Sequence, residues 1–268
     1  GTTTTAYLAS FKSGILGKQA ALGHLFCKFI GVLVCFPLMQ WLAWVSQSLG
    51  GGVSRQIANA HTLFNVFLAI LFFPFIPWGA LAQAHREILR LSDTVEQMVE
   101  RSIYLFRNGN EKEIETLKAM DQVVDFLNKG IKMYLTKLSQ KEMTPEQVQK
   151  EFELLLRTND LENIGDIVDK NILDLVKKNL KKGYTFSKEG WTEIMTFHSK
   201  VLECLRVSNA LFTSNDRALA GKLKILHEQI EDLTIELSEQ HVHRLHQGVK
   251  QSLETTSVHL DLLGNLQR

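Results

Sequence analysis

Acidic residues are missing from the first third of this chain. No Asp or Glu occurs between residues 1 and 84, where only 4 of the 30 Lys and Arg are found. The other 26 Lys and Arg lie further along, together with all 29 acids. The net charge of +1 therefore hides two regions of different composition. The first is an apolar segment typical of membranes, and the second is rich in charged residues, as soluble domains are.

Cysteine and enzyme motifs are scarce as well. Two of the three cysteines, Cys27 and Cys35, stand roughly 12 Å apart along a helix and cannot pair, while Cys204 is isolated. A disulfide framework is thus excluded. Without a P-loop, an HExxH motif or a nucleophile elbow we expect no enzyme, and the acidic second part disfavours nucleic-acid binding.

The ends of the chain also lack expected features. The N-terminus has no charged n-region, so no signal peptide is predicted. The first residue is not methionine, and the final "GNLQR" continues a helical pattern. We interpret the sequence as a fragment of a longer protein.

Two apolar segments dominate the acid-free part. Residues 20–45 hold one charge and residues 57–82 hold none, and each exceeds the roughly 20 residues that span a bilayer core. We predict full spans at about 20–45 and 57–80, within a membrane domain over residues 1–84. Lysines before the first span and basic residues after the second place both outer flanks in the cytoplasm. The alternative is a buried helical hairpin of a large soluble protein.

Four consecutive threonines, Thr2, Thr3, Thr4 and Thr5, precede these segments. Within a bilayer, irregular backbone survives only where it is buried in protein or lines a cavity. There, hydroxyl and carbonyl oxygens suit a small cation, and free N–H groups suit an anion. The residues alone leave open a second interpretation, a helix whose threonines bond back to the preceding turn.

The motifs "GTTTTAYLAS", "AALGHLF" and "ANAHTLFNV", in this order, resemble the second half of the Na/Pi type II family of bacterial sodium-dependent phosphate cotransporters. The resemblance covers most of residues 1–80 and implies a re-entrant or broken segment beside a sodium and phosphate site. It assigns Thr2 to Thr5 to that site. The Gln-Ser-Ser-Ser hairpin motif of the family and its first repeat are absent from this chain.

Long amphipathic helices follow. Leu154, Leu161, Val168 and Leu175 recur every seven residues, which is typical of a bundle seam. Thr144, Pro145 and Gln147 form a predicted N-terminal capping box, and Ser187 and Asn215 are further N-cap candidates. We predict six helices, at about 83–107, 110–139, 145–182, 188–213, 216–247 and from 249 onward. They form two three-helix bundles, over residues 85–182 and 183–268, the second truncated.

Two pairs of carboxylates stand one helical turn apart on the first bundle. Asp121 and Asp125 occur in "MDQVVDF", and Glu162 and Asp166 in "LENIGD", with Asp169 close by. The antiparallel helices carry both pairs at similar heights, as expected for a site that binds an oxygen-loving divalent or trivalent metal. The alternative is a solvated acidic face with lysine partners.

The carboxylate pairs and tandem bundles resemble the PhoU-like family, and "LENIGD" carries that resemblance most closely. PhoU-like proteins bind metal clusters on such motifs and take part in phosphate regulation, which implies the same role for Asp121, Asp125, Glu162 and Asp166.

The sequence as a whole predicts an all-α protein, with membrane-spanning helices followed by cytoplasmic bundles. Its expected function is sodium-coupled phosphate transport across the bacterial inner membrane, with sodium as the transported ion and a PhoU-like regulatory domain. The expected partners are phosphate, sodium and membrane lipid, and the helical domain suits a homo-oligomer or a signalling partner. The alternative is a membrane-anchored sensor or adaptor in phosphate signalling that transports nothing.

Overall fold

The computed structural model describes residues 25–26, 28–50, 52–72, 76–214 and 216–268. Helices account for nearly all of these residues, and none of the described ranges contains a strand, which confirms the all-α prediction. The chain divides into two compact units, Gly1–Gly79 and Ala80–Arg268. Each unit is considered by itself below.

The described part of the first unit is a bent helical hairpin. A helix at Lys28–Cys35 is followed by the 3-10 turn η1 (Phe36–Leu38) and by α3 (Met39–Ser48), and the helices on either side of η1 differ in direction by 87°. Pro37 lies at the start of η1, where its missing N–H and its ring interrupt the helix, as the sequence predicts. The chain then turns at Gly50, which has a φ of 74°, and returns as α4 (Val53–Phe72).

Spans across a membrane are only partly supported by this geometry. Among the described residues no single helix has both the length and the apolar character that a crossing requires. The bent pair Lys28–Cys35 and Met39–Ser48 meets the requirement jointly, by length and composition. The two full spans at about 20–45 and 57–80 therefore stay a prediction.

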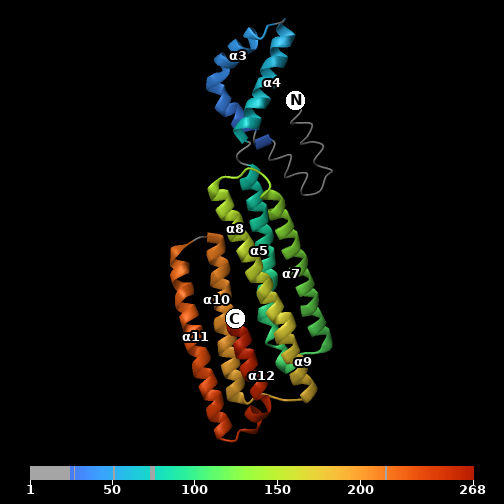
Figure 1. Ribbon diagram of the computed structural model, residues 1–268, viewed down its shortest axis with the longest axis vertical. Coiled ribbons are helices and arrows are strands. Elements are labelled where there is room, and N and C mark those ends of the chain that lie inside the picture. Colours follow the sequence, from blue (N-terminus) through green and yellow to red (C-terminus); the bar gives the residue numbers. More distant parts are fainter. Residues whose placement is uncertain (1–24, 27, 51, 73–75, 215) are drawn as a thin grey trace. The chain divides into compact units, whose positions relative to one another are not determined.

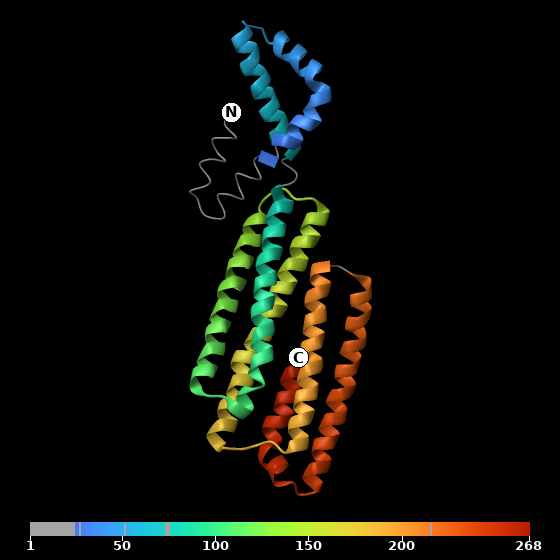
Figure 2. The same ribbon diagram turned by 180° about the vertical axis from the view of Figure 1, so that it is seen from behind.

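The second unit consists of long helices in two side-by-side sets (Figures 1 and 2). The first set comprises α5 (Ile76–Ser102), the short helix α6 (Leu105–Asn108), α7 (Glu111–Leu138) and a third long helix. This third helix consists of α8 (Pro145–Asp166), the π-helix η3 (Ile167–Ile172) and α9 (Leu173–Lys182), which follow one another without a break. The second set comprises α10 (Lys188–Ser214), α11 (Arg217–His246) and α12 (Lys250–Gln267). The bounds agree with the six predicted helices, except that the first begins earlier and breaks after Ser102.

Local sequence signals explain where these helices begin and end. The predicted capping box is present: Thr144 accepts a bond from the backbone N–H of Gln147, whose side chain bonds back to Thr144. Ser187 caps α10 by accepting from Gly190 N–H at 3.1 Å. Asn215 lies outside the described residues, and the observed cap of α11 is Asp216.

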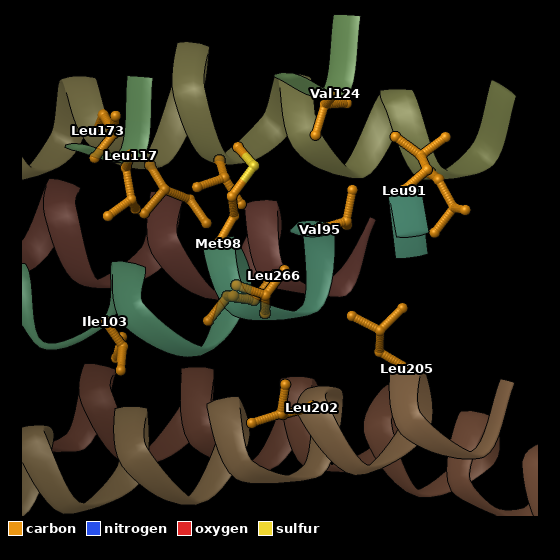
Figure 3. Close-up of a cluster of buried hydrophobic side chains, with 14 of the residues drawn as sticks. Leu91, Val95, Met98, Ile103, Leu117, Val124, Leu173, Leu202, Leu205 and Leu266 are labelled. Carbon is orange, nitrogen blue, oxygen red and sulfur yellow. The ribbon is translucent and has the colours of Figure 1, made fainter. Parts of the chain in front are cut away.

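One continuous hydrophobic core joins the two sets of helices. Figure 3 shows side chains of α5, α7 and α9 facing those of α10 and α12, among them Met98, Leu117 and Leu266. All four residues of the predicted seam on α8, η3 and α9 are buried. The two sets of helices therefore pack as one unit, and side chains of this shared core hold α7 and α8 in place.

Candidate metal centre on the first bundle

The approach of α8 to α7 positions the acidic residues. Gly165, one residue before Asp166, lies against α7: a Cβ there would be 3.2 Å from Cγ1 of Val124 and 3.4 Å from Oδ1 of Asp121. A larger residue would force the helices apart. Glycine at this position therefore brings carboxylates from the two helices together.

Three of the four predicted metal ligands meet at this point. Carboxylate oxygens of Asp121 and Asp125 from α7 and of Asp166 from α8 all lie within 4.8 Å of one another. Asp121 is buried at 8% exposure, and its Oδ1 has no hydrogen-bond partner among the described residues. A buried carboxylate oxygen without a donor is costly unless something else binds it. The oxygens are spaced closely enough for one cation to contact all three.

Electrostatic repulsion within the cluster is visible in the pKa of Asp121. Burial and the charges of Asp169, Asp125 and Asp166 raise this pKa from 3.8 to about 6, while the charge of Lys170 lowers it. Lys170 Nζ donates to Asp166 Oδ2 at 2.6 Å. A bound cation would relieve the same repulsion, because it favours the ionised carboxylates.

Glu162 does not belong to this group, although the sequence predicts it as the fourth ligand. Asp169 acts on the group electrostatically, because among the neighbouring charges its effect on the pKa of Asp121 is the largest. Its Oδ1 is buried and has no hydrogen-bond partner among the described residues. Asp169 lies within η3, the only π-helix in the described ranges, and such segments occur often at functional sites.

The second bundle holds a buried polar cluster that sequence reasoning missed. Arg244 pairs with both carboxylate oxygens of Glu193, and each side chain is only about one-tenth exposed. His241 stacks on His259 with ring centroids 4.3 Å apart, and burial lowers the pKa of both rings. These residues come from three helices, α10, α11 and α12, so no local motif reveals them.

Two further candidate sites lie away from this cluster, one at the N-terminal threonines and one in the second bundle. Thr2, Thr3, Thr4 and Thr5 lie outside the described residues, so their role in binding an ion or substrate stays a prediction. In the second bundle, Glu228 and Asp232 have the spacing of a carboxylate pair. They take part in no group of three potential ligands within the described ranges.

Comparisons with known proteins match one domain and, more weakly, the whole chain. Residues 88–176 match the PhoU domain family, and this range includes Asp121, Asp125, Glu162, Asp166 and Asp169. The whole chain aligns with "Putative inorganic phosphate export protein YjbB" of Salmonella typhimurium at 28% identity and of Escherichia coli at 27%, covering 55% of each relative. The chain thus spans about half the length of these curated relatives.

A shorter stretch, 28% of the chain, is 32% identical to "Uncharacterized protein YqeW" of Bacillus subtilis. No solved structure matches the chain. The PhoU-like character of the first bundle is therefore supported by sequence similarity, whereas the resemblance of residues 1–80 to sodium-dependent cotransporters stays a prediction.

Proposed function

We propose that this chain is part of a protein that moves inorganic phosphate across the bacterial inner membrane, with residues 80–268 as its cytoplasmic regulatory unit. The observation that carries the proposal is the PhoU match in the same chain as an apolar segment without acids. The names of the relatives that align along the whole chain support it. Flux, rather than catalysis, is the expected activity.

The test is radioactive phosphate flux through vesicles that contain the full-length protein. We expect flux above that of empty vesicles, and loading phosphate on one side or the other gives its direction. Phosphate movement equal to that of empty vesicles would contradict transport. It would favour the second candidate, a membrane-anchored sensor or adaptor, which the regulatory match alone equally supports.

Sodium coupling is the finer part of the proposal, and it rests on the predicted role of Thr2 to Thr5. The proposal expects flux to depend on a sodium gradient. It also expects Thr→Val at all four positions to weaken the apparent sodium affinity or the rate. Equal flux with sodium and with choline as the external cation would contradict coupling.

We further propose that Asp121, Asp125 and Asp166 bind a divalent or trivalent metal that regulates or stabilises the bundle. The donor set consists of carboxylate oxygens alone, which suits magnesium, manganese or iron better than softer metals. Binding to the folded state raises its stability by mass action. The melting temperature of the chain should therefore fall on chelation and recover with metal, and Asp121→Asn combined with Asp125→Asn should abolish the difference.

A further inference from the structure

We propose that Lys170 is an internal counter-cation of the acidic cluster, which a metal must displace in order to bind. The inference rests on the proposed metal site and adds how that site is regulated. In the absence of metal, the ammonium group of Lys170 supplies part of the positive charge that the carboxylates require. Lys170 therefore sets both the affinity of the site and the charge of the ion that it accepts.

The position of Lys170 supports this role. Its Nζ lies 2.6 Å from Asp166 Oδ2, one helical turn away. The hydrogen bond to Asp166 raises the pKa of Lys170 most, and the charges of Asp166, Asp121 and Asp125 raise it further. The charge of Lys170 in turn lowers the pKa of Asp121.

Metal binding and the Lys170 contact compete for the carboxylate of Asp166. A metal coordinated by Asp166 would lie about 2 to 2.5 Å from its carboxylate oxygen, within the space that the ammonium group occupies when it bonds to Oδ2. Two cations at that separation repel strongly. The side chain of Lys170 is 63% exposed, so the ammonium group can move into solvent when a metal arrives.

The competition also selects for ionic charge. Sodium or potassium carries the same charge as the ammonium group and gains little by replacing it. A divalent or trivalent ion interacts at least twice as strongly with the same carboxylates. Lys170 should therefore discriminate against monovalent ions, which are abundant in cells, without excluding manganese or magnesium.

The experiment is a calorimetric titration of the full chain with Mn²⁺ in detergent, after removal of bound metal with a chelator. Lys170→Met keeps the aliphatic stem and removes the charge, so Mn²⁺ should bind roughly tenfold more tightly. Lys170→Arg retains the charge and should stay within about twofold of the wild type. The matched control is Lys177→Met, which breaks a similar exposed pair, Lys177 with Asp174 at 3.0 Å, and should leave affinity unchanged.

A second measurement separates this role from a merely structural one. Without metal, Lys170→Met should melt below the wild type, because the cluster loses its counter-cation. With saturating Mn²⁺ the difference should vanish or reverse, whereas loss of a structural contact would lower both melting temperatures.

The outcomes distinguish the two proposals. If the wild type binds Mn²⁺ and Lys170→Met binds with the same affinity, the role of Lys170 is wrong and the metal site stands. If only Lys170→Met binds Mn²⁺, the counter-cation role is supported in its strongest form. If neither chain binds Mn²⁺ or any other divalent ion, both proposals fail.

Discussion

The pKa of Asp121 predicts an unusual dependence of stability on pH in the metal-free chain. Burial and three neighbouring aspartates raise this pKa to about 6 in the folded protein, against 3.8 ordinarily. The folded state therefore binds the proton more tightly than the unfolded state does. The stability contributed by this group is fully present below pH 4 and is lost as the pH rises towards 6.

The difference between the ordinary pKa of 3.8 and the folded pKa of about 6 sets the magnitude. One unit corresponds to about 1.4 kcal/mol, so ionisation of Asp121 costs the folded state about 3 kcal/mol at pH 7, and about 2 to 3 kcal/mol of this cost accrues between pH 4 and pH 7. Asparagine has nearly the same shape and does not ionise. Asp121→Asn should therefore gain stability relative to the wild type by that amount over the same interval.

The assay is urea denaturation of the chelator-treated chain, followed by circular dichroism at several pH values. The difference in unfolding free energy between Asp121→Asn and the wild type removes the contributions of distant groups that titrate in this range and keeps those of Asp121 and the aspartates coupled to it. The control is Asp174→Asn, because Asp174 is 69% exposed and bonded to Lys177, and its difference from the wild type should be nearly flat over the same pH range.

A difference for Asp121→Asn that stays constant from pH 4 to pH 7 would refute the reasoning. It would mean that water or local movement screens the buried carboxylate. Saturating Mn²⁺ provides an internal check, because a metal bound to ionised Asp121 should reverse the sign and make the wild type the more stable chain at pH 7.

Two further predictions concern packing. Glu193→Gln leaves the buried Arg244 without its ionised partner and should cost about 3 kcal/mol in urea denaturation. The exposed control is Glu203→Gln, which breaks the pair with Lys222 and should lower the unfolding free energy by less than about 1 kcal/mol. Similar losses for Glu193→Gln and Glu203→Gln would contradict the role of burial. The second prediction is that Gly165→Ala should destabilise the chain by about 1 kcal/mol and weaken metal binding, because the added methyl group meets Val124 and Asp121. Gly130→Ala on α7, with open space around it, should instead stabilise by about 0.5 to 1 kcal/mol, and equal effects would show that α7 and α8 are not tightly packed at Gly165.

The helices of the second unit were predictable because their signals are local. The seven-residue recurrence from Leu154 to Leu175 requires a buried stripe, and Thr144 with Gln147 satisfies the first backbone N–H groups of α8 wherever the helix packs. The convergence of Asp121, Asp125 and Asp166 was also predictable, since equal distances from a short turn bring residues of antiparallel helices to equal heights.

The effect of Asp169 on the group was not predictable by the same count. Height along a helix follows from residue number, but direction around it depends on regular winding, and η3 departs from that winding immediately after Asp166. Nothing in "IVDKNI" indicates a π-helix by composition. The cluster of Glu193, Arg244, His241 and His259 was missed for a different reason, because only the packing of three helices brings it together.

The π-helix η3 has a consequence for which changes of chain length the bundle can accept. A π-turn holds one residue more than an α-turn, so rewinding it as an α-helix would rotate α9 by about 100° relative to α8. The stripe that α9 buries, Leu173, Leu175, Val176 and Asn179, would then turn partly out of the core. The burial of these residues therefore fixes how far α9 is rotated about the helix axis relative to α8. Val168 and Ile172 within η3 are themselves buried, so their side chains stay constrained by the core. Deletion of a single residue within η3 would instead allow this segment to rewind as an α-helix with α9 still in phase, whereas a deletion within α8 or α9 would shift the buried stripe.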